Sequence, residues 1–425
     1  MRIPKRWIGV TALALTALAI VAAPASAHDP DTPEGKAEAA AFNRDHEPAV
    51  RQAPIVGQAL TPCQNGMAAQ YPCRNIDLLA VLPLSSIGGG NGNSMWGWTD
   101  TATGKEYIIF GRTNGAAFVD VSTPTAPRYL GNLPSHNGTS SSWRDIKVYR
   151  NHAFIGADGI SGHGMQVFDL TRLRNVTTPQ TFTPNARYTG FGNSHTLAVN
   201  EETGFIYAVG TNTCNGGVHM VNVQTPTAPR NAGCVSNDGY VHENQCVIYR
   251  GPDTTYRGRE ICFNYNVDTL TIVDVTTKSS PRQLSRTTYT NARYTHQGWL
   301  TPDHARLVMD DELDNNPRTL IWNVSDLDRP VHTGTYNPTF GSAIDHNQYI
   351  VGTRVYQANY RAGLRILDAS QIASNTLREI AFFDIYPANN NNGFNGAWNT
   401  YPFFASGTIA ISGIEQGLIL VRPTV

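Results

Sequence analysis

Histidine or tryptophan recurs at intervals of about fifty residues, where we expect short strands to begin. The series consists of Trp98, Trp143, His195, His242, His296, His346 and Trp398. Three acidic residues, Asp145, Glu243 and Asp345, lie beside members of this series. Imidazole and carboxylate groups are common protein ligands of zinc and related transition metals. The four histidines are therefore candidate ligands of a divalent metal, provided that the fold brings them together.

A second set of candidates lies between the expected strands: His163 and the acidic run Asp310-Asp311-Glu312 with Asp314. Carboxylates alone would suit calcium, whereas carboxylates with imidazoles would suit zinc. A structural interpretation stands beside each of these sites. Repeated His or Trp can pack the start of a strand and hydrogen-bond to the next repeat, and an acidic run can be a solvated turn. Tryptophan at three of seven positions favours packing for the series.

The motifs of common enzyme classes are incomplete in this chain. Ser161 lacks the following glycine of a G-x-S-x-G nucleophile motif. His242-Glu243-Asn-Gln-Cys246 begins like a metalloprotease motif, but it ends in cysteine on an expected strand. The glycine-rich run 88–92 lacks the lysine of a phosphate-binding loop. The sequence therefore leaves catalysis open.

A repeat determines the elements that must position these side chains. Seven runs rich in Val, Ile and Leu each precede Asp, Asn or, in the last copy, Val, at residues 120, 169, 222, 274, 323, 368 and 421. Their spacings are 49, 53, 52, 49, 45 and 53 residues. Such a period of short strands is typical of a β-propeller with one four-stranded blade per repeat. We expect the repeated Asp or Asn to cap an Asx turn.

We therefore predict an all-β, seven-bladed β-propeller over residues 61–425. In the second repeat we expect strands over 145–149, 153–156 and 165–170, and a fourth after the turn near Pro179. The last repeat ends at its third strand, and the run 76–83 resembles a fourth strand without partners. Pairing the two would close the ring and leave no exposed edge. Trp96, Trp98, Trp143 and Trp398 are expected in the core, or else exposed on one face for sugars or peptides.

In a propeller the first strand of each blade, strand A, lines the central channel. The connections from strand D to strand A and from strand B to strand C lie on one face. The topology thus predicts that His195, His242, His296 and His346 gather near one channel mouth, with Asp145, Glu243 and Asp345 beside them. His163 and the acidic run would lie on the same face.

Six cysteines in an exported chain suggest three disulfides. Cys246 and Cys262 lie at equal distances from the expected hairpin centre near Thr254, which suggests a cross-strand pair. Cys214 and Cys234 are expected at the same end of one blade, and Cys63 with Cys73 would close a short loop. A metal interpretation of the cysteines is weak because the chain has no C-x-x-C pair.

The N-terminus has the three parts of a secretory signal peptide, residues 1–27: a basic start, the apolar run 7–21 and the motif Ala25-Ser26-Ala27. Cleavage there would remove three of 32 basic residues and leave 29 against 33 acidic ones. This balance argues against nucleic acid as a partner. We expect a secreted monomer without a membrane span or C-terminal anchor. Residues 28–60 form an N-terminal extension, with a short helix possible over 34–50.

Several motifs resemble the choice-of-anchor B family, whose members contain repeats named after the sequence LVIVD. They are Tyr71-Pro-Cys-Arg-Asn-Ile-Asp-Leu-Leu79, Gly162-His-Gly-Met-Gln-Val-Phe-Asp-Leu-Thr-Arg172, Asn193-Ser-His-Thr196, Leu270-Thr-Ile-Val-Asp274 and Asp310-Asp-Glu-Leu-Asp314. The resemblance covers roughly residues 60–425 and implies an exported propeller. It implies no established activity.

Together these features predict an extracellular binding module that presents its channel-mouth face to a protein, peptide or glycan. The alternative is a metal-dependent hydrolase or lyase with its metal held by the histidines. A purely structural envelope component is the third possibility.

Overall fold

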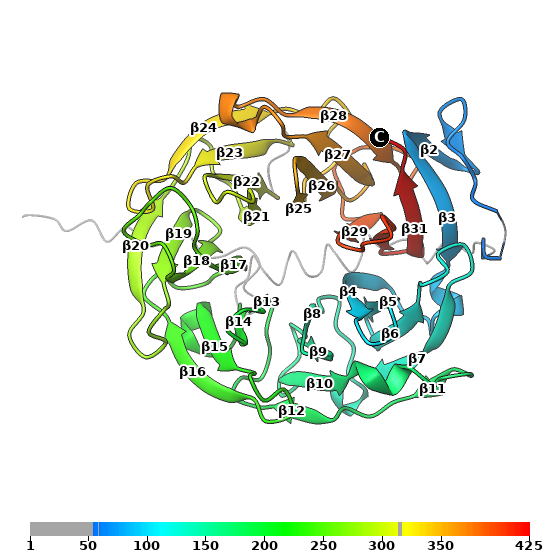
Figure 1. Ribbon diagram of the computed structural model, residues 1–425, viewed down its shortest axis with the longest axis horizontal. Helices are drawn as coiled ribbons and strands as arrows, with labels where there is room; N and C mark the ends of the chain where they lie inside the picture. The colour runs from blue at the N-terminus through cyan, green and yellow to red at the C-terminus, as the bar shows by residue number, and fades with distance from the viewer. Residues whose placement is uncertain (1–53, 58, 313–316) are drawn as a thin grey trace, which may run out of the picture.

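The computed structural model describes residues 54–57, 59–312 and 317–425, and they form a ring of seven antiparallel blades around a central channel (Figure 1). Four strands, A to D from the channel outward, build each blade, as the sequence predicts. The predicted signal peptide and the predicted helix over 34–50 lie outside the described residues.

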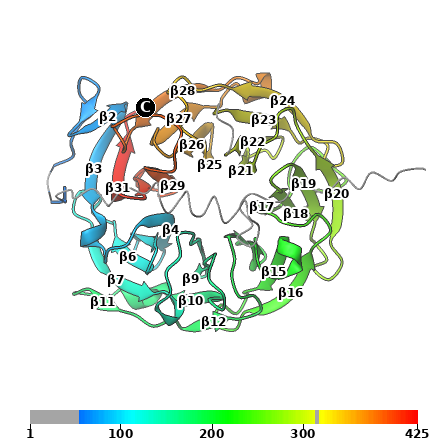
Figure 2. The ribbon, with the colours of Figure 1, turned by 180° about the vertical axis from the view of Figure 1, so that it is seen from behind.

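The A strands line the channel in both face views (Figures 1 and 2). They are β4 (Gly92–Asp100), β8 (Ile146–Tyr149), β13 (Thr196–Asn200), β17 (Glu243–Ile248), β21 (Thr295–Leu300), β25 (Asn347–Val351) and β29 (Ala397–Tyr401). The B strands are β5 (Lys105–Arg112), β9 (His152–Ile155), β14 (Phe205–Val209), β18 (Glu260–Tyr265), β22 (Arg306–Asp311), β26 (Arg354–Ala358) and β30 (Ile409–Gly413).

The C strands carry the repeated apolar run: β6 (Gly115–Asp120), β10 (Met165–Asp169), β15 (Val218–Asn222), β19 (Leu270–Asp274), β23 (Thr319–Asn323), β27 (Leu364–Asp368) and β31 (Gly417–Pro423). The D strands are β7 (Arg128–Pro134), β12 (Ala186–Tyr188), β16 (Arg230–Val235), β20 (Arg282–Thr287), β24 (Val331–Tyr336), β28 (Arg378–Phe383) and β3 (Ile76–Leu82). B and C strands are almost wholly buried because neighbouring blades cover both of their faces, whereas most D strands are partly exposed at the rim.

Short elements complete the fold. Strands β1 (Met67–Ala68) and β2 (Tyr71–Arg74) form a hairpin that extends the sixth blade, and β11 (Gln180–Thr181) joins the rim of the first. The 3-10 helices are η1 (Leu84–Ser86), η2 (His136–Gly138), η3 (Leu170–Leu173), η4 (Cys214–Gly216) and η5 (Ile372–Ser374). In the second blade the residues just after Pro179 therefore pair with the neighbouring blade, and strand D begins only at Ala186.

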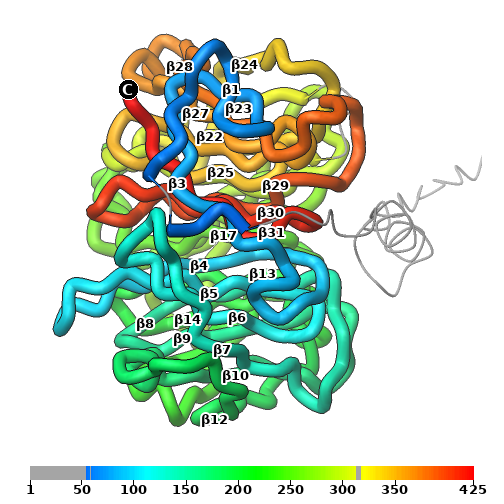
Figure 3. Tube along the Cα trace, turned by 90° about the vertical axis from the view of Figure 1, so that its right-hand side faces the viewer, coloured from blue at the N-terminus to red at the C-terminus, as the bar shows by residue number. Residues whose placement is uncertain are grey.

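Ring closure follows the prediction. Strand β3 pairs antiparallel with β31, from Ile76 opposite Pro423 to Leu82 opposite Leu418. Figure 3 shows this N-terminal strand in blue running past the red C-terminal strand. The last blade thus takes its fourth strand from the other end of the chain, and no blade remains open.

The repeated Asp or Asn at the end of strand C makes the same contact in six blades. Its side-chain oxygen accepts a hydrogen bond from the backbone N–H two residues further on, at 2.9–3.0 Å. These are the predicted Asx turns, and they turn the chain toward strand D in each repeat.

All six cysteines pair as expected: Cys63–Cys73, Cys214–Cys234 and Cys246–Cys262. The last pair joins residues that lie directly opposite each other on β17 and β18. Within the ranges that the structure describes, no helix is long and apolar enough to cross a membrane.

Candidate functional site

Four imidazole rings form a row along the channel mouth, as the sequence predicts. Each lies at or just before the start of an A strand, in the third to sixth blades. The ring centroids of His195 and His242 are 4.2 Å apart, those of His242 and His296 4.4 Å, and those of His296 and His346 4.7 Å. All four side chains are buried. We refer to these residues as the histidine row.

Hydrogen bonds fix the orientation of each ring in the row. His296 donates its Nδ1 proton to the carbonyl oxygen of His346 at 2.9 Å, and His346 donates in turn to the carbonyl of Trp398 at 2.6 Å. The Nδ1 of His242 bonds to the hydroxyl of Tyr294 at 2.8 Å. The Nδ1 of His195 lies 2.8 Å from the carboxylate of Asp158. Hydrogen bonds at Nδ1 therefore orient the rings, and the Nε2 atoms of His296 and His346 both face Glu312.

Two residues of the acidic run join the row instead of forming a solvated turn. Glu312 lies 3.7 Å from the Nε2 of His296 and 3.8 Å from the Nε2 of His346, and Asp310 lies 3.5 Å from the Nδ1 of His296. Both are buried, Asp310 near the end of strand β22 and Glu312 in the turn that follows it. The solvated-turn interpretation was therefore wrong. Asp314 lies outside the described residues.

Among the described residues of the run, three carboxylates do not converge for calcium. Asp311 faces away from the row, as alternation along a strand requires. It accepts hydrogen bonds from the backbone of Arg293 and Tyr294 and from the hydroxyl of Tyr289. Its role is to hold the connection that leads into β21.

The carboxylates determine where the row carries charge. Burial disfavours the imidazolium form of His296, but Glu312 and Asp310 outweigh it and raise the pKa of His296 to about 9. Burial lowers the pKa of His346 to about 3, and the charge of His296 acts in the same direction. Burial raises the pKa of Asp310 to about 6. A charged ring thus stacks against a neutral one, which avoids repulsion at a centroid distance of 4.7 Å.

Asp145 and Glu243 play different parts. Asp145 is buried and accepts hydrogen bonds from Lys147, the backbone of Leu197 and the hydroxyl of Ser94. Glu243 borders a cavity of about 40 Å³, with room for a few water molecules. Burial, reinforced by Asp145, raises the pKa of Glu243 to about 8. Asp345 is also buried, next to His346.

His163 does not join the row. Its Nδ1 donates to the carbonyl of Gly164 at 2.9 Å, so its Nε2 accepts from the guanidinium of Arg144 at 3.1 Å. Burial and Arg144 lower the pKa of His163 to about 4. A neutral ring that accepts from arginine is a structural partner and not a metal ligand.

The tryptophans are core residues, and one was misplaced in the repeat. Trp96, Trp98 and Trp398 are buried, which favours the core interpretation, and Trp143 is half-buried. Trp98 does not lead into a strand: it is the seventh residue of β4, stacks on Tyr107 and donates to Asn151 in an A–B hairpin. Asp158, the partner of His195, was not among the residues predicted from the sequence. No short-range signal marks it, because 37 residues separate the two.

A hollow of about 750 Å³ opens on the same face, over the second to fourth blades. Its walls are the B–C loops at 159–161 and 210–216, and the D–A residues Asn193 and Tyr240. Gly210 has a positive φ of 58°, and a Cβ there would lie 2.5 Å from the Cβ of His195. The close approach of this loop to the histidine row therefore requires glycine. We refer to this hollow as the Tyr240 pocket.

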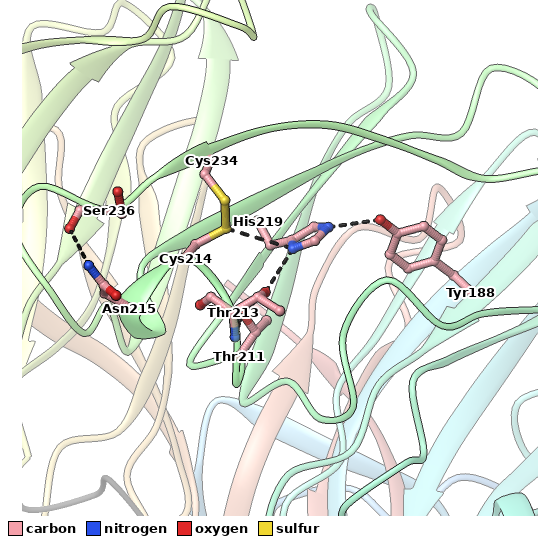
Figure 4. The surroundings of a disulfide bond; sticks show 8 residues. All are labelled: Tyr188, Thr211, Thr213, Cys214, Asn215, His219, Cys234 and Ser236. Atoms are coloured by element: carbon pink, nitrogen blue, oxygen red, sulfur yellow. Dashed lines mark hydrogen bonds between the residues drawn. A yellow bond between two sulfur atoms is a disulfide. The ribbon is translucent and has the colours of Figure 1, made fainter.

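The Cys214–Cys234 disulfide borders this pocket (Figure 4). Behind it, His219 bonds to Thr213 through Nδ1 and to the hydroxyl of Tyr188 through Nε2, both at 2.8 Å. Cys214, His219 and Cys234 lie close enough together to hold a metal, but the sulfurs are bonded to each other. The disulfide therefore ties the B–C loop to strand β16.

Comparison with known proteins supports the fold. The β-propeller domain of Cps50 (Swd1) from Myceliophteria thermophila matches with a TM-score of 0.51 and 12% identity, over 80% of this chain and 99% of that domain. At this identity the match shows the propeller fold alone. No protein-family profile and no curated protein matches the chain.

Proposed function

We propose that this protein is a secreted binding module and that its Tyr240 pocket binds a neutral glycan. The observation that carries the proposal is the chemistry of the pocket wall. None of the described residues that line the pocket is charged, and Ser161, Asn193, Thr211, Asn212 and Thr213 supply hydroxyl and amide groups. Such groups pair with the hydroxyls of a neutral sugar without the desolvation penalty of an ionised side chain.

Tyr240 supplies the apolar surface that a sugar ring needs. It is half-buried, and its ring packs beside Gly210 and Gly216. A side chain at either glycine would crowd the ring, so the two glycines leave room for it. An aromatic ring with polar groups around it is a common arrangement for orienting a ligand in a pocket. Loops on a rigid scaffold are also where binding residues usually lie.

Secretion and family membership are part of the proposal. The three disulfides support an oxidising compartment, and the signal-like N-terminus supports export. The motif Leu270-Thr-Ile-Val-Asp274, which resembles the LVIVD repeat, forms strand β19 and ends in an Asx turn. Its place as the C strand of a blade supports kinship with the choice-of-anchor B propellers.

The test is a screen of the mature chain against neutral oligosaccharides, followed by calorimetric titration of the best ligand. Tyr240→Ala should weaken binding about tenfold, which corresponds to a contact worth about 1.4 kcal/mol. Asn212→Ala removes one exposed amide from the pocket and should weaken binding less.

Tyr336→Ala provides the matched control, because Tyr336 is a partly buried tyrosine on the outer strand β24 of the fifth blade and does not line the pocket. It should bind like the unmodified chain. The proposal fails if no neutral oligosaccharide binds, or if folded Tyr240→Ala and Asn212→Ala both keep full affinity.

A further inference from the structure

One cluster of side chains that could bind a metal lies at the histidine row, in the described part of the chain. One ligand atom each of His242, His296 and Glu312 lies within 4.8 Å of the others, and all three side chains are buried. The Nε2 of His346 lies 3.8 Å from the same carboxylate. We infer that these four residues bind one divalent transition metal ion of the zinc type.

The separations of the ligand atoms from Glu312 are close to those of a zinc site. Tetrahedral zinc with bonds of about 2.0–2.1 Å holds its ligand atoms about 3.4 Å apart. Glu312 reaches the Nε2 atoms of His296 and His346 at 3.7 and 3.8 Å, near that value. Closing the set around one ion requires His242, His346 and Glu312 to move toward one another, and binding releases the Nε2 proton of His296.

The surroundings match those of a metal-bound imidazole. Histidines that bind metals usually donate their other ring N–H to a carbonyl or carboxylate, which fixes the ring and its tautomer. His296 and His346 donate Nδ1 protons to backbone carbonyls, and the Nδ1 of His242 bonds to Tyr294. Tyr360 donates to Glu312 at 2.8 Å and orients the carboxylate. Each proposed ligand therefore has a partner on its far side.

The ligand set indicates both the metal class and its role. Three imidazole nitrogens and one carboxylate suit zinc and its neighbours and are a poor match for calcium, which takes oxygen ligands. Four protein ligands in a buried position leave no open coordination site, as in structural zinc centres. The ligands come from the fourth, fifth and sixth blades, so the ion would link three blades at the channel mouth.

The experiment uses the mature chain without a histidine tag, stripped with a chelator and then titrated with zinc or cobalt alone. We expect about one ion per chain by plasma mass spectrometry, and cobalt should give the intense visible absorption of a tetrahedral site. Zinc should raise the midpoint of thermal unfolding.

Glu312→Gln and His296→Asn should each weaken metal binding at least tenfold and remove the zinc-dependent rise in unfolding temperature. His195→Asn is the matched control. It removes a buried histidine from the same row whose Nδ1 is held by Asp158, and it should keep the bound metal.

The inference is overturned if the unmodified, folded chain takes up neither metal. It is also overturned if Glu312→Gln and His296→Asn bind like the unmodified chain, or if His195→Asn loses the metal equally. Should His296→Asn not fold, Glu312→Gln and the titration of the unmodified chain decide the question.

Discussion

The two ends of the channel are built from the same seven A strands but from opposite kinds of side chain. The mouth holds the histidine row with Asp310 and Glu312, linked by directional hydrogen bonds. Further along the strands, rings from four blades pack edge to face: Trp96, Trp299, Tyr349, Tyr401 and Phe403. We call these five residues the aromatic end. Because a strand rises about 3.3 Å per residue, two to three residues separate the ends by roughly 7–10 Å.

The difference shows that one scaffold can place its stabilising apolar contacts and its polar, ligand-type side chains at different ends of the channel. At the aromatic end the rings pack against one another and border the small cavity beside Glu243, so burial of apolar surface supplies most of the stability there. At the mouth each buried polar atom needs a hydrogen-bond partner. Each such bond adds little net stability, but together the bonds allow only one arrangement of the side chains. Lys147 connects the two ends, since its ammonium group bonds Asp145 at 2.7 Å and lies 4.7 Å from the ring centroid of Trp96.

The largest expected effect is at the aromatic end. Trp96→Ala should lower the free energy of unfolding by about 3–5 kcal/mol, because it removes a buried ring in contact with Tyr349, Tyr401 and Phe403. Chemical denaturation measures this change. Trp143→Ala at the mouth, where the ring is half-buried, should cost about 1–2 kcal/mol. Equal losses would show that the two ends do not differ in packing.

Removing the cation that links the two ends should cause an intermediate loss of stability. Lys147→Met should lower the free energy of unfolding by about 2–3 kcal/mol, because Asp145 stays buried without its cation, although Leu197 and Ser94 still donate to it. The double variant with Asp145→Asn should recover most of the loss, as a double-mutant cycle by denaturation would show. A double variant that loses the sum of the two single losses contradicts the coupling.

The smallest expected effect is the pH dependence of stability that His163 contributes. The pKa of His163 is lowered to about 4, so the unfolded chain binds more protons than the folded one between pH 6.5 and 4. Its contribution to stability is complete above pH 6.5 and is lost as the pH falls toward 4, by about 1 kcal/mol at pH 5.5.

His163→Gln keeps an acceptor for Arg144 but takes up no proton, so its stability should fall less between pH 7.5 and 5.5. Parallel denaturation at both pH values measures the difference. Identical slopes for His163→Gln and the unmodified chain would contradict the assignment.

Local patterns predicted most of the fold. The run of apolar residues before each Asp or Asn predicted the C strands and their Asx turns, because both depend on residues adjacent in sequence. The equal distances of Cys246 and Cys262 from a hairpin turn predicted their pairing for the same reason. The histidine row was predicted because propeller topology places equivalent positions on one face.

Other features required the folded structure. Sequence spacing alone placed Trp98 in the histidine series, whereas the pairing of β4 with β5 places it deep in the strand. The acidic run was read as a solvated turn, since alternation into the core becomes visible only when β22 is paired. The pairing of His195 with Asp158 and of His163 with Arg144 joins separate segments of the chain.

The sequence by itself determined the number of blades, the strand that closes the ring, the three disulfides and the face that gathers the histidines. These features depend on periodicity and short-range spacing, and the same pattern recurs in each repeat. The tertiary structure alone decided which carboxylates meet the imidazoles, which rings pack together at the far end of the channel and where the uncharged pocket opens. Those features arise between blades, because they depend on how side chains that are distant in sequence pack against one another.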